Sequence, residues 1–591
     1  MGASMTSDEA GFLGVERSIT GRRWRGPDPA QQRLTDAMAQ QTRLPHAVCA
    51  VLARSGVAPD AAERYLAPSL RDLLPDPRSL RDMEAAAARL LSAVDGNEKI
   101  AIFADYDVDG GASAALLICW LRSMGREATL YIPDRIAEGY GPNAPAMKML
   151  AQAHDLILCV DCGTVSHDPI AAAKGADVVV IDHHLGAETL PPALAVVNPN
   201  RQDETGDLGY LCAAGVVFLM LVEANRQLRV RGNTGPDLMA LLDLVALATV
   251  ADVAPLVGVN RAFVRQGLRV MAARNRVGLR ALADVARLEA APTSYHLGFV
   301  LGPRVNAGGR IGAADLGARL LACNDPSEAE ALAERLEMLN AERREVEAAV
   351  RAEAIAQAQA RGGDGALAWA AGEGWHPGVI GIAAARLKEA MAQPAMVIAL
   401  DGNEGKGSGR SVPGIDLGAA VQKLVREGFL LKGGGHPMAA GLTVARARIE
   451  EAMARLAELL AQQGAVGAGA ASQLRIDSVL MPAAVSVDLI ERIEAAGPFG
   501  ASAPAPRFAF PDMRIQSIRR MGETHLRLRF GDGQGNVLDA VAFGAYESDL
   551  GSAIANAQGQ RLHLAGKVEI NHWSGRSNVQ LRLDDAAHPA R

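Results

Sequence analysis

Two adjacent histidines follow an apolar run in the stretch "VVVIDHH", which covers residues 178 to 184. The β-branched residues before them are typical of a buried strand. Adjacent histidines cannot both be ordinary core residues, because histidine is polar and less often fully buried than the apolar residues before it. The sequence therefore predicts that Asp182, His183 and His184 carry out chemistry at the end of a strand.

Further acids follow other apolar runs of the same region. "KIAIFADYDVDG" and "DLILCVDCG" also read as strands that end in carboxylates, and helical stretches separate them. In an open parallel α/β sheet, ligands bind beyond the carboxyl ends of the strands. Asp252 lies in the apolar segment "LMALLDLVALATVADVAPL", where an acid is seldom kept without a reason. One edge is therefore predicted to gather Asp105, Asp107, Asp109, Asp161, Asp182, His183, His184 and Asp252.

Such a cluster of carboxylates repels itself in a partly desolvated crevice unless a cation neutralises it. Carboxylates mixed with imidazole suit Mn²⁺, or Mg²⁺ with fewer nitrogen ligands. Two such ions about 3.5 to 4 Å apart activate water and stabilise an in-line displacement at phosphorus. One histidine is expected to bind metal while its neighbour meets the phosphate, with Asp182 orienting them.

Three other interpretations compete for these motifs. "DYDVDG" opens like a calcium-binding EF-hand loop, but the twelfth position of that loop would be Leu116, so the calcium interpretation fails. A solvated turn is the plain alternative for its closely spaced acids. Cys159 and Cys162 form a C-x-x-C pair without a second pair at zinc-ribbon spacing, and we expect buried thiols.

The 591 residues predict three or four domains in a mixed α/β chain. An N-terminal helical segment contains the Arg-rich arm "RSITGRRWRG", which is either a solvated terminus or a docking element. A doubly wound parallel sheet follows, then a long charged helix expected as a solvated spacer, a second smaller α/β domain, and short alternating strands typical of a β-barrel. The expected boundaries are 1–95, 96–325, 326–364, 365–466 and 473–591.

Composition excludes several classes of protein. The net charge of −7 gives no global basic surface, so any nucleic acid must bind at local patches. No apolar run approaches the ~20 residues of a membrane span, and the N-terminus lacks a signal peptide, so a cytoplasmic protein is expected. Six scattered cysteines do not form a disulfide framework.

The motifs "ADYDVDG", "VDCG", "DHH" and "ATVADVAPL" resemble, in order, the four motifs of the DHH phosphoesterases. "PRVNAGGR" and "GGGHPMAAG" are similar to motifs of the branch that degrades single-stranded DNA from its 5′ end. Phe103 stands where other DHH enzymes carry a histidine, as in that branch. The resemblance runs from about Asp105 to the C-terminus and implies a DHH domain, a connecting helix, a DHHA1 domain and an OB-fold domain.

The resemblance also implies roles for individual residues. It gives Asp107, Asp109, Asp161, His183 and Asp252 as metal ligands, with Asp105 and His184 adjoining. It assigns phosphate binding to Arg304, Asn306 and Arg310. Without the resemblance, the segment that contains these residues would be interpreted as a surface loop. The resemblance places the 5′ end of the substrate in the second lobe, near Lys406, Ser408, Arg410, Gly434, Gly435 and His436, and Arg135 near the substrate.

The barrel offers a track for the rest of a single strand, since OB-like folds combine basic grooves with stacking aromatics. The candidates are Arg527, Arg529, Lys567, Trp573 and Arg576, with Arg519 and Arg520 beside them, although exposed arginines on strands are often merely solvated.

The expected function is a metal-dependent 5′→3′ exonuclease specific for single-stranded DNA, using two Mn²⁺ or Mg²⁺ ions in DNA repair and recombination. The expected partners are a single-stranded-DNA-binding protein and a helicase, and a monomer is expected. One alternative is a DHH phosphodiesterase that cuts short oligonucleotides or cyclic dinucleotides. The other is a DNA-binding scaffold without activity, which should have lost acids that this chain retains.

Overall fold

The computed structural model describes residues 11–135, 138–362, 365–465, 473–573 and 576–589, without the side chains of 572–576. The chain divides into two compact units. Unit 1 combines the described residues within 1–74, 255–265 and 471–591. Unit 2 combines those within 75–254 and 266–470.

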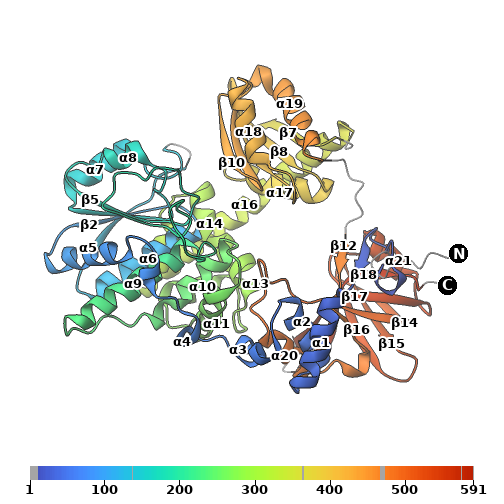
Figure 1. The fold of residues 1–591 in the computed structure, drawn as a ribbon. Coiled ribbons are helices and arrows are strands. Elements are labelled where there is room, and N and C mark those ends of the chain that lie inside the picture. Colours follow the sequence, from blue (N-terminus) through green and yellow to red (C-terminus); the bar gives the residue numbers. More distant parts are fainter. Residues whose placement is uncertain (1–10, 136–137, 363–364, 466–472, 574–575, 590–591) are drawn as a thin grey trace. The chain divides into compact units, whose positions relative to one another are not determined.

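Unit 2 begins with a five-stranded parallel sheet, which confirms the predicted doubly wound fold (Figure 1). The strand order β3-β2-β4-β5-β6 places the two acid-bearing strands β4 and β5 beside each other and β2 next to β4. Because all pairings are parallel, the carboxyl ends of these strands meet at one edge. The strands are β2 Ile100–Ala104, β3 Ala128–Tyr131, β4 Leu156–Val160, β5 Asp177–Ile181 and β6 Ala195–Val197.

Helices cover both faces of this sheet, which explains why its strands are continuously apolar. In Figure 1, α7 and α8 lie on one face, and α5, α6 and α9 lie on the other. Met147 and Leu150 of α7 pack with Phe103, Ile157 and Val180 in one core. The helices are α5 Met83–Asp95, α6 Val108–Ser123, α7 Ala144–Ala153, α8 His167–Ala171 and α9 Ala213–Val230.

A helical region follows the sheet along the chain. It includes a π-helical segment, η5, which runs without a break into α14. The motif "PRVNAGGR" therefore lies on a helix and not on the surface loop that was the alternative. The elements are α10 Leu242–Ala251, α11 Gly258–Ala272, α12 Val277–Val285, α13 Ser294–His296, η5 Leu297–Leu301, α14 Gly302–Ile311 and α15 Leu316–Ala322.

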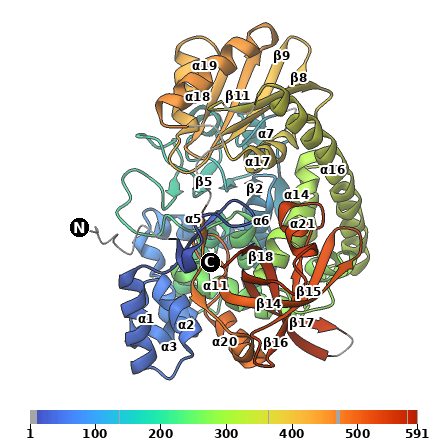
Figure 2. The ribbon, with the colours of Figure 1, turned by 90° about the vertical axis from the view of Figure 1, so that its right-hand side faces the viewer.

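The predicted connecting helix is α16, Pro326–Ala360, and Asp325 caps its N-terminus by accepting a hydrogen bond from the Glu328 N–H. The expectation of a solvated spacer is wrong. Leu336 and Leu339 of this helix are fully buried, and α16 packs against α12, α14 and α17 (Figure 2). Most of its charged residues are exposed, so the overall polarity of the helix concealed an apolar stripe.

The second α/β domain of unit 2 holds a five-stranded sheet of order β10-β11-β9-β8-β7, in which only the β7–β8 pairing is parallel. One face packs on α18 and α19 and the other on α17 and α16. The bounds are β7 Ala368–Glu373, α17 Ile380–Met391, β8 Ala395–Asp401, β9 Glu404–Arg410, α18 Leu417–Arg426, β10 Lys432–His436, β11 Ala439–Ala445 and α19 Ile449–Gln462.

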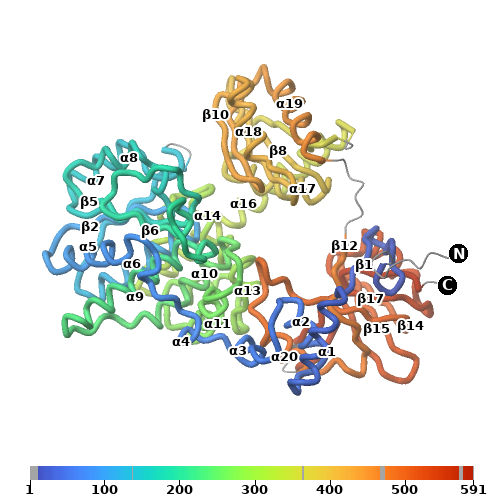
Figure 3. The backbone as a smooth tube through the Cα atoms, in the orientation of Figure 1, coloured from blue at the N-terminus to red at the C-terminus, as the bar shows by residue number. Residues whose placement is uncertain are grey.

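Unit 1 is built around a closed five-stranded barrel, which confirms the predicted OB-like fold (Figure 3). The barrel closes because β14 pairs with both β15 and β17, while β16 and β17 both pair with β18. Its elements are β14 Phe508–Met521, β15 His525–Gly531, β16 Val537–Ala542, α21 Asp549–Ala555, β17 Arg561–Trp573 and β18 Arg576–Ala587.

The N-terminal segment belongs to the same unit as the barrel, so the Arg-rich arm is docked. Its strand β1, Arg23–Arg25, pairs in parallel with β12, Gln473–Arg475. The fully buried Trp24 indole N–H donates a 2.9 Å hydrogen bond to the Asp585 carboxylate. Met38 of α1, Pro29–Gln41, and Leu52 of α2, His46–Arg54, enter the barrel core.

Within the ranges that the structure describes, no helix combines the length and the apolar character needed to span a bilayer.

Candidate active site

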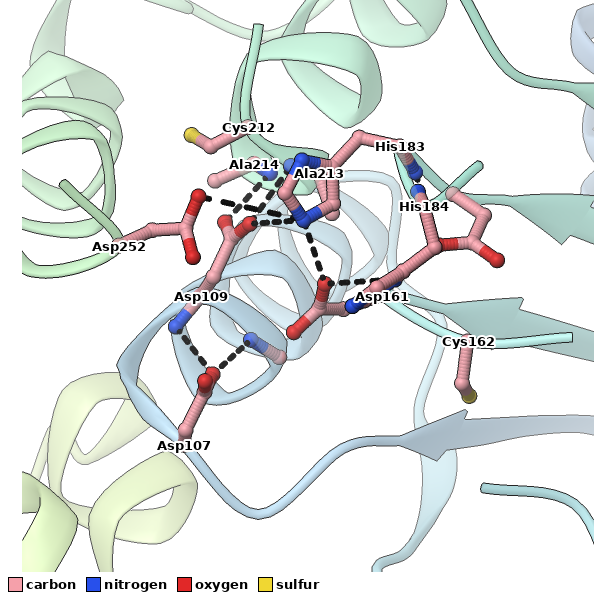
Figure 4. Close-up of polar contacts among 12 residues, drawn as sticks. Asp107, Asp109, Asp161, Cys162, His183, His184, Cys212, Ala213, Ala214 and Asp252 are labelled. Atoms are coloured by element: carbon pink, nitrogen blue, oxygen red, sulfur yellow. Dashed lines mark hydrogen bonds and ion pairs between the residues drawn. The ribbon is translucent and has the colours of Figure 1, made fainter. Parts of the chain in front are cut away.

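The structure brings the predicted acids and histidines together at the carboxyl edge of the parallel sheet (Figure 4). Asp161 follows β4, and Asp182 follows β5 directly. Asp105 follows β2, and Asp252 follows α10 from outside the sheet. Asp105, Asp161 and Asp182 are almost fully buried.

His183 lies at the centre of the acidic cluster. Its Nε2 atom lies 3.3 Å from an Asp161 oxygen, 3.7 Å from an Asp109 oxygen and 3.9 Å from an Asp252 oxygen. Asn200 donates a 2.6 Å hydrogen bond from its amide to the His183 carbonyl, which fixes the backbone of this residue. One imidazole nitrogen surrounded by three carboxylates is a ligand set that fits a divalent cation.

Three groups of potential ligand atoms overlap at this edge. One joins Asp109, His183 and Asp252, a second joins Asp161, His183 and His184, and a third joins Asp105, Asp107 and Asp161, each within 4.8 Å. Asp161 belongs to two groups and can bridge them. The three groups together contain the five ligands implied by the family resemblance, and also Asp105 and His184, so the assignment of individual ligands stays a prediction.

Backbone amides hold two of the acids in place. Asp107 is the N-cap of α6 and accepts hydrogen bonds from the Asp109 and Gly110 N–H groups at 2.8 and 3.2 Å. Asp109 accepts from the N–H groups of Ala213 and Ala214, at 2.6 and 2.8 Å, at the N-terminus of α9. Helix N-termini favour negative charge, so these acids are fixed before any ion binds.

His184 faces a different set of partners from His183. Its Nδ1 atom lies 2.8 Å from Asp182, and its Nε2 atom lies 3.0 Å from the Tyr140 hydroxyl. Burial alone would lower the pKa of His184, but the Asp182 carboxylate raises it to about 9. Burial works to raise the pKa of Asp182, and the hydrogen bonds from His184 and Thr164 hold it well below its usual range. The pair therefore carries an imidazolium at neutral pH.

The remaining acids bear a large electrostatic cost. Burial, followed by the neighbouring carboxylates, raises the pKa of Asp105 and of Asp161 well above the usual range. Among the described residues, the buried Oδ1 atoms of Asp105 and Asp161 accept no hydrogen bond. Buried oxygens that lack donors are suited to a cation, so the residues present fit divalent metal ions.

Metal affinity is expected to depend on pH through Asp252. Burial and the Asp109 carboxylate raise the pKa of Asp252 to about 8, against ~3.9 in an unfolded chain. Since this folded pKa is the higher one, the metal-free protein loses stability as the pH rises from about 4 to about 8. A cation must displace the proton, so the Mn²⁺ affinity should rise by up to ~10-fold per pH unit until about pH 8. Calorimetric titration in buffers of different ionisation enthalpy measures both the affinity and the proton release.

The variant Asp252→Asn provides the control for this experiment, because it removes one titrating ligand. It should bind Mn²⁺ more weakly and release fewer protons. An Mn²⁺ affinity that stays constant between about pH 6 and pH 8 in the unaltered protein would contradict the assignment of Asp252.

A second cluster collects positive charge. The Arg135 guanidinium lies 5.0 Å from the centroid of the Tyr106 ring, and Gly309 lets α14 approach the same ring, since a Cβ there would come within 2.6 Å of it. Arg310 donates a 3.1 Å hydrogen bond to the Gly378 carbonyl. Burial and the nearby Arg135 lower the pKa of Arg410.

Arg310 and Arg410 are partly buried cations of this second cluster. Burial lowers the pKa of Arg310 as well, with Arg135 adding to the effect. Across the described part of the chain, neither guanidinium forms an ion pair with a carboxylate. A partly buried cation without an ion-pair partner is costly, and a phosphate would relieve that cost through bidentate hydrogen bonds.

The other predicted phosphate-binding residues are placed differently. Arg304 forms an ion pair with Glu337 of α16 and donates to the Val300 carbonyl, so the structure does not bring it to Arg310. Asn306 accepts a hydrogen bond from the Val108 N–H at 3.0 Å and so steadies the N-terminus of α6. Ser408 accepts from Arg410 at 3.2 Å, and Lys406 lies exposed on β9.

The glycines that were predicted to lie near the 5′ end of the substrate form part of a strand. Gly434, Gly435 and His436 belong to β10, which lies at the edge of its sheet and pairs only with β11 among the described strands. Gly435 has a φ of +152°, a conformation that other residues rarely adopt. The His436 Nδ1 atom accepts a 3.4 Å hydrogen bond from the Met438 N–H.

The predicted strand-binding residues of the barrel differ in their exposure and in their ion pairs. Arg527 and Arg529 are exposed, but both pair with Asp539, at 2.7 and 3.3 Å. Lys567 is half-buried, and burial lowers its pKa. The side chains of Trp573 and Arg576 lie outside the described residues.

Sequence reasoning missed several residues that the structure places in or near these sites. Tyr140 and Asn200 have a signal in hindsight, because both lie in segments that follow strands of the parallel sheet, Tyr140 after β3 and Asn200 after β6. On the barrel, exposed Phe543 and Tyr546 contact Arg582 and Arg520 in cation–π geometry, at 5.5 and 3.9 Å from ring centroid to guanidinium. These two aromatics extend the set of candidate strand-binding residues, which already included Arg520.

Cysteines near the metal cluster behave as predicted for buried thiols. Cys159 and Cys162 are buried, and the Cys162 thiol donates to the Val160 carbonyl at 3.4 Å. Burial raises the pKa of both thiols, which disfavours the thiolate form that binds zinc.

Comparison with protein families identifies three domains in the chain. Residues 99–249 match the DHH family, N-terminal domain, residues 363–462 match the DHHA1 domain, and residues 476–585 match the RecJ OB domain. Phe103, which precedes the first motif acids, lies in the first of these matches. The domain boundaries drawn from the sequence stay a prediction.

Whole-chain relatives give the same result. The single-stranded-DNA-specific exonuclease RecJ of Dickeya dadantii is 37% identical over 92% of this chain and 97% of its own, and that of Escherichia coli is 36% identical over 88% and 92%. The crystal structure of Thermus thermophilus RecJ with Mn²⁺ has a TM-score of 0.79 at 29% identity, over 96% of this chain and 80% of that one. The same protein with Mg²⁺ has a TM-score of 0.74 at 28% identity, over 96% and 79%. The motifs, the two catalytic lobes, the barrel and these full-length relatives all place the chain in the RecJ family of DHH phosphoesterases.

Proposed function

We propose that the chain is a single-stranded-DNA-specific exonuclease that hydrolyses phosphodiester bonds with two divalent ions and releases mononucleotides from the 5′ end. This proposal rests on two groups of charged side chains in unit 2, one acidic and one basic, whose polar atoms are not fully paired within the described residues. The buried Oδ1 atoms of Asp105 and Asp161 accept no hydrogen bond, and Arg310 and Arg410 have no carboxylate at ion-pair distance, within the described residues.

The proposed ligands are Asp107, Asp109, Asp161, His183 and Asp252. Divalent ions bound there would lower the pKa of a water molecule and neutralise the phosphate oxygens. The protein itself positions these ligands through the amides at the N-termini of α6 and α9. Asp161, which belongs to two of the groups, is proposed to serve both ions.

His184 is proposed to act on the substrate and not as a metal ligand. Its imidazolium, held by Asp182, presents a proton at Nε2, where the Tyr140 hydroxyl now lies at 3.0 Å. That proton can be donated to a phosphate oxygen while charge develops on it. Asn198 donates a 2.8 Å hydrogen bond to the His184 carbonyl and so orients the residue.

Polarity is proposed to come from the arginine cluster. A 5′-terminal phosphate bound by Arg410 and Arg310 would leave the first internucleotide phosphate as the one nearest the metal ligands. Guanidinium groups suit this role because they bind phosphate in a bidentate way. A strand that lacks a free 5′ end would not fill this site.

The first experiment is digestion of a single strand labelled at its 5′ or its 3′ end, with Mn²⁺, with Mg²⁺ and with a chelator, beside the matching blunt duplex. We expect immediate release of a 5′-labelled mononucleotide that requires metal and is absent on the duplex. Strand binding without cleavage would indicate a scaffold instead. Cleavage limited to oligomers of a few nucleotides would indicate a short-substrate phosphodiesterase.

The biological setting is proposed on the same basis. Removal of 5′-ended single strands suits DNA repair and recombination, with a helicase supplying the strand and a single-stranded-DNA-binding protein covering it. The cytoplasmic location and the monomeric state inferred from the sequence stay predictions, and gel filtration with light scattering tests the second.

A further inference from the structure

Two aromatic side chains stack on each other at the surface of unit 2. The rings of Tyr295 and Phe299 lie 5.1 Å apart with an interplanar angle of 25°. They are 57% and 68% exposed, whereas Leu297 and Leu301 on the same helical stretch are fully buried. The leucines therefore hold this stretch to the fold, and the aromatic pair leaves more than half of its surface in water, where that surface gains nothing from the hydrophobic effect.

This aromatic pair lies on α13 and η5, a continuous helical stretch that leads from the metal ligands to the phosphate-binding residues. η5 packs closely on the end of α10, since a Cβ on Gly298 would lie 3.4 Å from Val250 and one on Gly302 would lie 3.2 Å from the Ala251 Cβ. Asp252 follows these two residues directly. In the other direction, η5 continues into α14, which carries Arg310.

We propose that Tyr295 and Phe299 form a stacking surface for the bases of the single strand close to the metal centre. This inference rests on the proposed function. Aromatic side chains stack on any base, because every base has a π-face, and the interaction does not depend on sequence. The His296 ring, in edge contact with Tyr295 at 5.9 Å between centroids, widens the surface.

The stacking surface gives a physical reason for preferring single strands. Inside a duplex both faces of each base are covered by neighbouring base pairs, and the terminal base of a blunt end exposes one face but stays paired, so a base can reach the aromatic pair freely only in a single strand. In a single strand the faces are available. Tyr295 and Phe299 would therefore add affinity for unpaired DNA alone, next to the residues that cut it.

The test compares the full-length protein with the double variant Tyr295→Ala/Phe299→Ala. Without metal, the affinity for a fluorescent 5′-phosphorylated strand should fall roughly 10-fold or more. With Mn²⁺, KM should rise by a similar factor while kcat on saturating strand changes less than about twofold. Tyr295→Phe/Phe299→Tyr keeps both rings and should restore binding. Met338→Ala, which removes a side chain that is 62% exposed on α16, is the matched control and should bind like the unaltered protein.

A second substrate tests whether bases are the groups recognised. A strand with abasic sites at successive positions should bind the unaltered protein more weakly at one or two of those positions, and the double variant should not distinguish them. If the double variant keeps full affinity and the same response to abasic sites, the inference is wrong, and the exposed pair serves another purpose such as protein docking. If the unaltered protein cleaves no single strand, the proposed function itself fails, which is a separate outcome.

Discussion

The variant Asp161→Asn is expected to lose cleavage of single-stranded DNA while it still binds the strand. Asp161 belongs to two of the three ligand groups, so its loss disturbs both proposed ions. The turnover rate should fall by much more than ~100-fold, the upper range for loss of a residue that only supports a metal ligand. Rapid-quench kinetics with Mn²⁺ measure the rate, and fluorescence anisotropy measures binding of the same strand.

The same variant should be more stable than the unaltered protein when no metal is present. The Asp161 Oδ1 atom is buried and accepts no hydrogen bond from the described residues, so a neutral amide of the same shape removes an electrostatic cost. Added Mn²⁺ should then raise its Tm less than it raises that of the unaltered protein. Asp168→Asn, an exposed acid of α8, should change neither property. Unchanged turnover in Asp161→Asn would refute the two-ion assignment.

The second large effect is expected from Arg410→Ala, which should remove the preference for a 5′-phosphorylated strand. Arg410 and Arg310 lack carboxylate partners in the described structure, and a terminal phosphate would supply the missing charge. Loss of one charge-assisted contact should reduce that preference about 10- to 100-fold. The measurement is the ratio of kcat/KM on 5′-phosphorylated and 5′-hydroxyl strands of one sequence.

Two further variants separate phosphate recognition from general charge. Arg410→Lys keeps the charge but loses the bidentate geometry, so it should retain only part of the preference. Arg386→Ala removes an exposed arginine of α17 that pairs with Glu389, and it should behave like the unaltered protein. If Arg410→Ala kept the full preference for the phosphate, the 5′ end would have to bind elsewhere.

The acids at the carboxyl edge of the sheet could be predicted from the sequence, because each acid directly follows the strand that positions it. Each strand is an apolar run of about five residues, and the acid that follows it must lie at the carboxyl end. Asp161 and Asp182 could be placed in this way with no knowledge of distant contacts. The closed barrel was likewise predictable from short alternating strands.

Other features depend on contacts that are distant in the sequence. Arg304 and Arg310 lie in the same motif, yet Glu337 draws the first toward α16 while the second reaches Gly378. The local sequence pattern predicts neither of these two contacts. The docking of the N-terminal arm through Trp24 and Asp585 joins residues 561 positions apart, which no periodicity reveals.

The pairing of the N-terminal segment with the barrel imposes an order on folding during synthesis. About 400 residues separate Leu74 from Ala471, where the other main part of unit 1 begins. At a ribosomal rate of about 5–20 residues per second, the first segment waits roughly 20 to 80 seconds for its partners. Throughout that time Trp24, Met38 and Leu52 lack the side chains that later bury them. This N-terminal part of unit 1 is thus a stretch that a chaperone would have to shield until the barrel has been made.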